Sequence, residues 1–331
     1  MTLYALDDIT DSFEATKAFL WPIDVGRWAK LALVVFFGGL GGSNPLQLGG
    51  GSPGGDVPET PGTPGISDGI SSISGAELAI IGAILGSIVL LVIIFAVVGS
   101  IMEFIFVDSL RNERVRIRHY WGQQWRRGLR LFGFRVVLGI VTFGIIGLLG
   151  VVVLAPVVFD QGEFSLGLLF LAIPLGILLM IASGLINGFT TMFIVPIMML
   201  EDRGVLSGWR RFWTTFTGQW KQYGAYALVA FVLQIAGGIA AGIATLIGAL
   251  VIAIPFGIIG VLGFGLLQIS QIAGWAVIAL VAIFLVLGLI VLTLFVSVPV
   301  QTFIRYYALL VLGDTNEEFD IIPERRQTLR E

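Results

Sequence analysis

The chain contains no cysteine, one histidine and few charged residues. The lack of cysteine excludes disulfides and thiolate metal sites. Zinc needs several ligands, so we interpret His119 as a solvated residue at a membrane surface. The apolar segments hold neither a serine with a histidine partner nor two facing aspartates, and the chain has no P-loop. We therefore expect no enzymatic activity, no metal and no cofactor.

Charge is scarce because most of the chain is apolar. Hydrophobic residues make up 56% of the 331 residues and charged residues 12%, and the mean hydropathy is +0.96. A soluble domain needs more polar surface, so the bilayer must be the solvent for most of this chain. The start, MTLYALDDITDS, is acidic and does not resemble a cleaved signal peptide. The composition predicts an all-α, polytopic membrane protein.

The apolar runs predict six transmembrane helices. Four are expected at about residues 27–42, 77–107, 131–159 and 165–200. Pro174 and Pro196 should kink the fourth of these helices. The segment from Gln222 to Ile304 has no Asp, Glu, Lys or Arg, and basic residues flank both of its ends. It must cross an even number of times, and its length allows two crossings, with a bent outer end or a short re-entrant turn around 255–265.

Basic residues predict the orientation of these helices. All nineteen Lys and Arg lie in the N-terminal segment, in residues 111–135, in residues 201–222 or at the C-terminal end. Most Trp and all Tyr residues lie on the same side, with Trp275 on the other. Basic loops and aromatic belts mark the cytoplasmic interface, so both termini are expected in the cytoplasm of a cell-membrane protein.

The domain organisation follows from the same pattern. Residues 1–313 are expected to form a single transmembrane domain, and residues 314–331 a charged cytoplasmic tail. Residues 43–75 are rich in Gly, Pro and Ser, so they bury too little surface to order and are expected to be a disordered external loop. A lid that captures a ligand is the alternative interpretation of this loop.

A pattern repeats three times along the chain. The motifs are WPIDVGRWAKLALVVF, WRRGLRLFGFRVVLGI and WRRFWTTFTGQWKQYGAYALV. Each predicts a cytoplasmic amphipathic surface helix that leads into an apolar hairpin. The six transmembrane helices are therefore expected as three hairpins.

The two most basic surface helices are expected to lie in the membrane interface. Trp anchors should reach the acyl boundary from Trp121, Trp125, Trp209, Trp213 and Trp220. Anionic lipid head groups should be contacted by Arg118, Arg126, Arg127, Arg210, Arg211 and Lys221. Nucleic-acid binding is excluded because these helices keep an apolar stripe, which for residues 201–223 consists of Leu206, Trp209, Trp213, Phe216, Trp220 and Tyr223.

Glu103 is the one acid inside an apolar stretch. Intramembrane charges are costly and are usually paired or functional. Arg135 and Arg305 lie at a comparable depth, and either is expected to neutralise Glu103 in a structural ion pair. A proton or substrate site is the alternative. The uncharged polar residues are expected to form interhelical hydrogen bonds or to line a polar path; they are Asn187, Gln234, Gln268, Gln271 and Gln301.

A resemblance covers nearly the whole chain. Its residues are LYALDDITDSFEATKAFLWPIDVGRWAKLALVVFF, the Gly/Pro-rich loop, WRRGLRLFGFR, VPIMMLEDRGVLSGWRRFW and RYYALLVLGDTNEEFDIIPERR. These resemble an uncharacterised family of haloarchaeal multi-pass membrane proteins. More distantly, the pattern of helices is similar to the membrane domain attached to bacterial glycerophosphodiester phosphodiesterases, whose catalytic domain has no counterpart here. The resemblance implies a fold and a compartment, and no catalytic residue.

Two hypotheses for the function remain. The first is a non-enzymatic integral membrane protein that organises the membrane or acts as a partner of other membrane proteins. Small residues recur at spacing four in 236–248. They are expected to pack within one protomer; a homo-oligomer interface is the alternative. The other hypothesis is a transporter or channel for a small uncharged or lipid-like solute. A continuous polar cavity at Asn187, Gln234 or Gln301 would favour it.

Overall fold

The computed structural model describes residues 4–41, 75–158 and 166–331, and these residues form helices joined by short turns. The N-terminal part contains α1 (Tyr4–Leu20), α2 (Val25–Gly41), α4 (Gly75–Arg111) and α5 (Ile117–Val158). The middle contains α6 (Leu166–Phe189), the π-helix η2 (Thr190–Ile194), α7 (Val195–Glu201) and α8 (Val205–Gly218). The C-terminal part contains α9 (Trp220–Leu267), α10 (Gln271–Thr315), the 3-10 helix η3 (Glu317–Phe319) and α11 (Pro323–Arg330). The predicted disordered loop, residues 43–75, lies outside the described residues except for Gly75.

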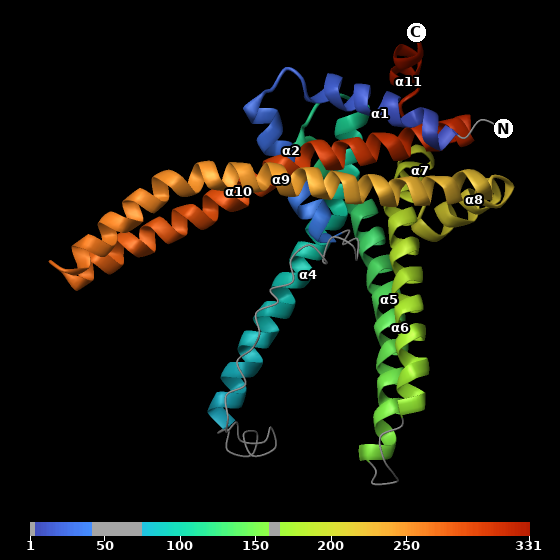
Figure 1. The fold of residues 1–331 in the computed structure, drawn as a ribbon. Coiled ribbons are helices and arrows are strands. Elements are labelled where there is room, and N and C mark those ends of the chain that lie inside the picture. The colour runs from blue at the N-terminus through green and yellow to red at the C-terminus, as the bar shows by residue number, and fades with distance from the viewer. Residues whose placement is uncertain (1–3, 42–74, 159–165) are drawn as a thin grey trace.

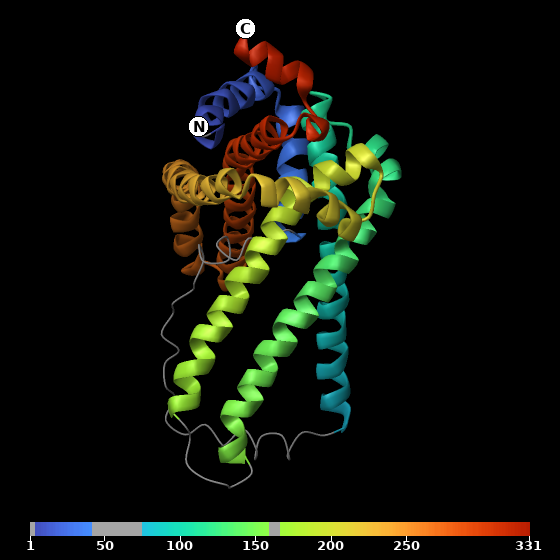
Figure 2. The same ribbon diagram turned by 90° about the vertical axis from the view of Figure 1, so that its right-hand side faces the viewer.

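The molecule consists of a packed hub and long arms that leave it (Figures 1 and 2). We define the arms as residues 75–98, 136–158, 166–189 and 227–297, and the hub as the other described residues. The arms of α4, α5 and α6 extend to one side of the hub, while the hairpin of α9 and α10 runs across them. The helices α1 and α11 lie at the opposite end from the tips of α4, α5 and α6. The three expected hairpins therefore do not lie side by side.

Five of the helices are long and apolar enough to cross a membrane, with mean hydropathies from 2.5 to 3.2 over their most apolar stretches. They start at Gly75, Ile117, Gly167, Trp220 and Gln271. The expected first span corresponds to α2, which has 17 described residues. A span needs ~20 residues, so the described part of α2 is shorter than a typical span. Consecutive long helices pack against one another, α2 with α4, α4 with α5, α5 with α6, and α9 with α10.

The expected surface helix around Trp121 and the span that follows it form one helix in the structure. Helix α5 runs without a break from Ile117 to Val158. No proline interrupts this stretch before Pro156, and isolated glycines weaken a helix without ending it. Gly128 instead permits close packing, since a Cβ there would lie 2.4 Å from Cγ1 of Ile101 on α4. The prediction of a separate surface helix at this position is therefore wrong, because these residues form the first turns of a longer helix.

The charge-free segment forms one hairpin of two very long helices. Helix α9 continues through Pro255 to Leu267, so no re-entrant turn is present at 255–265. The hairpin turns at residues 268–270, and the Ser270 hydroxyl accepts a hydrogen bond from the Ala273 amide at 3.4 Å. This serine cap begins α10, which explains why the turn lies there.

The helix that begins at Leu166 changes its winding before Pro196. The Val195 amide donates to the carbonyl of Thr190, five residues earlier, and this hydrogen bond closes η2. Proline has no N–H and its ring clashes with the preceding turn, so the helix relaxes there. At Pro174, by contrast, α6 continues.

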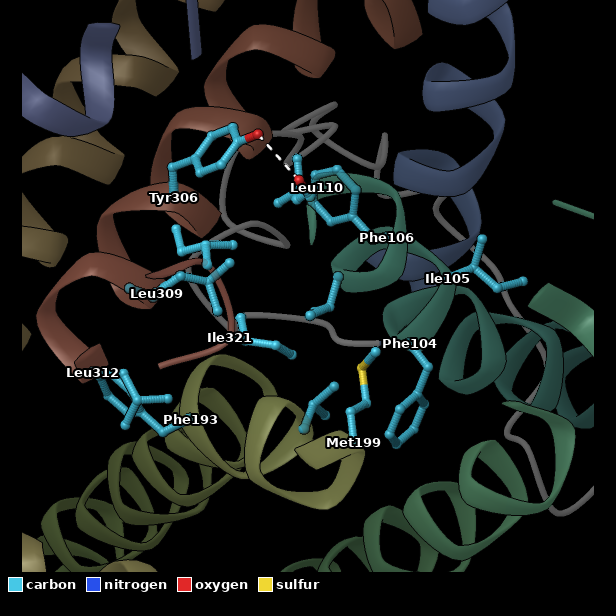
Figure 3. Close-up of a cluster of buried hydrophobic side chains, with 14 of the residues drawn as sticks. Phe104, Ile105, Phe106, Leu110, Phe193, Met199, Tyr306, Leu309, Leu312 and Ile321 are labelled. Atoms are coloured by element: carbon cyan, nitrogen blue, oxygen red, sulfur yellow. Dashed lines mark hydrogen bonds between the residues drawn. The ribbon is translucent and has the colours of Figure 1, made fainter. Parts of the chain in front are cut away.

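The buried side chains are concentrated in the hub. Every residue from Gly99 to Leu110 of α4 is buried. Figure 3 shows Tyr306 of α10 reaching the Leu110 carbonyl, a hydrogen bond of 3.5 Å, and Phe104 beside Met199. The C-terminal residues beyond 313 also belong to this core, because Phe319, Ile321 and Ile322 are buried. The charged tail therefore folds onto the hub instead of extending from it.

Candidate functional site: a charged junction in the hub

Three helices bring charged side chains together inside the hub, and a fourth element, η2, supplies a neutral acceptor. Glu103 comes from α4, Arg135 from α5 and Arg305 from α10, with Thr191 of η2 between them. Glu103 is 5% exposed and Arg305 3%. The structure thus joins all three residues that the sequence analysis names as an ion pair, and both arginines contact the same carboxylate.

Arg305 is held by Glu103 and by the irregular backbone of η2. Its Nη2 forms an ion pair with the Glu103 carboxylate, and its Nη1 donates to the Thr191 carbonyl at 2.6 Å. This carbonyl is free to accept for a structural reason. The Val195 amide, its α-helical donor, bonds to Thr190 instead, and the next donor along would be Pro196, which has no N–H. The π-helix therefore creates the acceptor that Arg305 uses.

Arg135 makes a second set of contacts, mostly to neutral groups. It donates from Nε to Asn187 Oδ1 at 3.1 Å, from Nη1 to Ser100 Oγ at 3.3 Å and from Nη2 to Thr191 Oγ1 at 2.8 Å. Its Nη2 lies 3.6 Å from the Glu103 carboxylate. The junction therefore fastens α4, α5, α6 with η2, and α10 to one another through charge-assisted hydrogen bonds.

Two hollows lie next to this junction. A small cavity of about 40 Å³ is lined by Glu103, Gln301 and Arg305 together with Val34, Val35, Gly38, Gly39, Met102, Phe106, Thr191 and Met192. A larger, mainly apolar groove of about 590 Å³ lies between α6 and α9 and contains Gln234. Met192 lines both hollows, so the groove and the charged cavity adjoin at this residue.

The uncharged polar residues of the sequence analysis do not converge. Asn187 accepts from Arg135, Gln234 lies in the apolar groove, and Gln301 lines the small cavity. Gln268 and Gln271 lie at the turn between α9 and α10, where both are exposed. A single polar path through these residues does not emerge from the described part of the chain.

Two of the six predicted lipid-binding residues are bound by the protein itself. Arg127 pairs with Asp202 at 2.7 Å, and its hydrogen bond lowers the pKa of that carboxyl group. Arg211 pairs with Glu318 and, at 3.4 Å, with Glu201. Acids of α7, of η3 and of the turn after α7 therefore pair with these two arginines, and their contact with lipid head groups stays a prediction.

The other four basic residues have no ion pair within the described residues. Arg118, Arg126, Arg210 and Lys221 are all exposed. Arg126 lies 5.7 Å over the Trp125 ring, and Lys221 lies 5.9 Å over the Trp220 ring. These pairs of a cation and an aromatic ring leave the charges accessible.

Four of the five predicted Trp anchors are exposed. Trp121, Trp125, Trp213 and Trp220 are 36%, 45%, 56% and 62% exposed. Trp209 is half-buried and donates from Nε1 to the Thr190 hydroxyl at 2.9 Å. The buried face of α8 carries Phe212, which the predicted stripe omits and which stacks on Phe193 at 5.5 Å. Aromatic residues lie on two faces of α8, so the sequence alone did not show which face is buried.

His119 stays exposed at the start of α5, where its Nε2 lies 3.4 Å from Gln123 Nε2. The residues that the structure describes contain no group of three or more His, Cys, Asp or Glu side chains that could hold a metal ion.

A second charged cluster joins the two ends of the chain, and the sequence pattern did not indicate it. Arg330 of α11 contacts Asp8, Asp11 and Asp314 at 3.0, 3.3 and 2.5 Å. Burial and the neighbouring Asp314 carboxyl, to which it is hydrogen-bonded, raise the pKa of Asp8 to about 8. The three acids lie on α1 and α10, more than 300 residues apart in sequence, so no local spacing predicts their meeting.

The comparisons with known proteins give a family. A model described as a family of unknown function, DUF7544, matches residues 3–322. The chain belongs to this family. No curated protein and no solved structure matches it. The matched range includes the charged junction and ends at Ile322, before α11 and its arginines.

Proposed function

We propose that this protein is a non-enzymatic integral protein of the cell membrane that acts as a scaffold for other membrane proteins. The hub fixes the inner ends of the helices, and the arms offer apolar surfaces for contact within the bilayer. Membership of the family supplies no activity, so the proposal rests on the geometry of the chain.

The exposure of the arms is the observation that carries the proposal. In the most apolar 18-residue stretch of each of the five long helices, between 0% and 11% of the residues are buried. Phe143 and Phe170, for example, are 72% and 82% exposed. A chain that used these helices as a transport bundle would bury them against one another. Arms that are exposed along their length instead leave surface for lipids, other proteins or further copies.

The exposed basic residues support an orientation with the hub at the cytoplasmic face. We propose six crossings with both termini in the cytoplasm, α2 contributing the first of them. Because the chain has no cysteine, single cysteines can be introduced and labelled with a membrane-impermeant maleimide. Gly62→Cys should react in intact cells, whereas Thr328→Cys should react only after the membrane is opened. Labelling of Thr328→Cys in intact cells would contradict the orientation.

Crosslinking in native membranes tests the scaffold itself. After crosslinking and purification, the proposal expects a partner or a second copy in stoichiometric amount. Arg135→Gln, which loosens the junction that holds the arms, should reduce this yield. Recovery of an uncrosslinked monomer, with no partner, would contradict the proposal.

The groove between α6 and α9 favours a second candidate function. Its volume of about 590 Å³ and mainly apolar walls suit a lipid-like solute. This candidate is a binder or transporter of such a molecule. Ala227→Trp, which fills the groove, should abolish co-purification of a lipid, while Phe143→Trp on an exposed arm should not. Equal lipid content in both variants would remove this candidate.

The resemblance to haloarchaeal proteins and to the membrane domain of glycerophosphodiester phosphodiesterases stays a prediction. It agrees with the proposal in one respect, since neither implies a catalytic residue in this chain.

A further inference from the structure

The last helix, α11, differs from the rest of the hub in what holds it in place. It contains no buried residue, whereas Phe319, Ile321 and Ile322 immediately before it are buried. Its Leu329 side chain is half-buried against the hub. An isolated helix shorter than about 12–15 residues is marginal in water, so α11 depends on its contacts with other elements.

Most of these contacts are ion pairs between three arginines and five acids. We call the acids the acidic seat, which consists of Asp8, Asp11 and Asp314 opposite Arg330, Asp314 and Asp320 opposite Arg326, and Glu113 opposite Arg325. The pair of Arg325 spans 3.2 Å, and both pairs of Arg326 span 2.9 Å. Helix α11 therefore joins α1, the turn after α4, the end of α10 and the turn after η3.

The acids of the seat outnumber the arginines that neutralise them. Within the described residues, each ion pair of these acids runs to α11. Even with Asp8 protonated, four carboxylates face three guanidinium groups. The net attraction between α11 and the seat therefore acts at a distance as well as at contact.

Dissolved ions can reach these pairs. The side chains of Arg325, Arg326 and Arg330 are 21%, 17% and 42% exposed. Salt weakens ion pairs that keep contact with the solvent, and it shortens the range of the attraction between unlike charges. The hold of the seat on α11 should therefore decrease as the ionic strength rises.

We propose that α11 is a strap, held on the acidic seat by charge, which detaches at high ionic strength while the rest of the hub stays folded. Segments with few buried apolar contacts open at a lower free energy than a core does. Contacts without α11 keep α1 on α10, as where the Phe19 ring packs edge-on against the Tyr306 ring at 6.0 Å. Detachment thus uncovers the acids of the seat without unfolding the hub. The strap acts within the hub, so it does not depend on whether the arms contact partner proteins.

Hydrogen exchange of the purified full chain in detergent, measured at several sodium chloride concentrations, tests the proposal. Raising the salt from about 0.1 M to about 1 M shortens the Debye length from ~10 Å to ~3 Å. The amides of α11 should then exchange on the order of ten times faster, while those between Ile304 and Gly313 of α10 change by less than about twofold. Dilution of the salt should restore the protection of α11.

Three results would overturn the proposal. Amides of α11 that exchange freely at low salt would show that the helix is not docked. Protection of α11 that is equal at all salt concentrations would show that charge does not hold it. A simultaneous loss of protection in α11 and in the buried part of α10 would show that the hub opens as a whole.

Variants locate the effect on Arg330, which makes three of the six ion pairs. Arg330→Gln should exchange its α11 amides at low salt as fast as the unchanged protein does at high salt. Arg330→Lys keeps the charge and should restore the salt dependence. Lys17→Gln removes an exposed charge of α1 that has no ion pair in the described part of the chain, and it should leave the exchange of α11 unchanged. Equal exchange in Arg330→Gln and Lys17→Gln would contradict the strap.

A distance measurement detects detachment with every ion pair intact. Nitroxide labels are attached to Thr10→Cys on α1 and Gln327→Cys on α11, two exposed positions in a chain without other cysteines. At low salt the labels should give one narrow distance distribution, and at high salt a broad one that extends to longer distances. A distribution that stays narrow at high salt would contradict the proposal.

Discussion

The hub and the arms are parts of the same helices, but side chains are buried in the hub and mostly exposed in the arms. In α10, the residues from Ile304 to Gly313 are buried, whereas Leu280, Leu287 and Val291 are more than half exposed. In the hub, specific side chains interlock with neighbours from other helices. In the arms most side chains are apolar and exposed, although neighbouring arms also touch, as where Gly248 of α9 lies against Leu292 of α10. Apolar composition therefore accounts for helices that are long and apolar enough to cross a membrane, whereas the contacts that join several helices lie mainly in the hub.

The largest effect should come from breaking the charged junction. Glu103→Ala leaves two arginines without a carboxylate in a buried site. Removing one partner of a buried ion pair costs about 3–5 kcal/mol, so the free energy of unfolding should fall by this amount. Denaturant unfolding of the purified protein measures it.

A double variant separates the charge from the packing. Glu103→Leu with Arg305→Leu removes both partners, and part of the lost stability should return. A loss below about 1 kcal/mol for Glu103→Ala would mean that the junction is solvated, and the contrast between hub and arms would fail there.

The next effect compares the same substitution at two positions of one helix. Leu309 of α10 is 1% exposed, and Leu287 of α10 is 51% exposed. Leu309→Ala should lower the free energy of unfolding by about 2–5 kcal/mol, because it leaves a cavity in the hub. Leu287→Ala should lower it by less than about 0.5 kcal/mol in detergent. Equal losses would show that the arm of α10 is packed as tightly as its hub segment.

The hub should also respond to pH through Asp8. Its pKa of about 8 in the folded protein exceeds the ordinary value of 3.8, because the group is buried beside Asp314. Between these two values folding takes up a proton, so stability should fall as pH rises from about 4 to about 8 and then stay constant. The charged and titratable neighbours are Asp11, Tyr307, Asp314 and Arg330.

Thermal unfolding at several pH values, in one salt, measures this dependence. Asp8→Asn should flatten the decrease of Tm with pH, whereas Asp11→Asn should keep it. A Tm that rises between pH 5 and pH 8 would contradict the protonated Asp8.

The smallest effect concerns the basic residues at the edge of the hub. Arg126 and Arg210 are exposed without an ion pair in the described residues, and Arg127 and Arg211 are paired with acids. Replacing the first two with Gln should weaken retention of anionic lipid by about 1 kcal/mol per residue. Replacing the second two should change it less. Native mass spectrometry of the bound lipids compares the two double variants, and equal losses would refute the distinction.

The difference between hub and arms also explains what the sequence could predict. Long apolar runs and the distribution of basic residues predict an all-helical chain with helices able to cross a membrane. Glu103 stood out because a lone acid in an apolar run must have a partner, and few arginines lie at its depth. The arms are therefore visible in composition, and Glu103 is the one residue of the charged junction that stands out from its apolar surroundings.

Features that depend on contacts between distant segments were not predictable. The acceptor at Thr191 exists because η2 and Pro196 together free its carbonyl, and no spacing reveals this. Phe212 and Trp213 are both aromatic neighbours on α8, and only the packing against Phe193 decides which is buried. The contact of Arg330 with Asp8 joins the two ends of the chain.

The central claim is that α4 and α5 meet in the hub and separate along their arms, and paired cysteines test it most directly. Both pairs join α4 to α5 in a chain that has no other cysteine. Asp108→Cys with Gln124→Cys replaces two side chains that lie 2.7 Å apart in the hub. Leu78→Cys with Leu154→Cys places the same groups near the tips of the two arms, which Figure 1 shows far apart. A short bifunctional maleimide should join the hub pair within one chain and should not join the arm pair. Efficient intramolecular crosslinking of the arm pair would show that the helices pack along their whole length and would contradict the account.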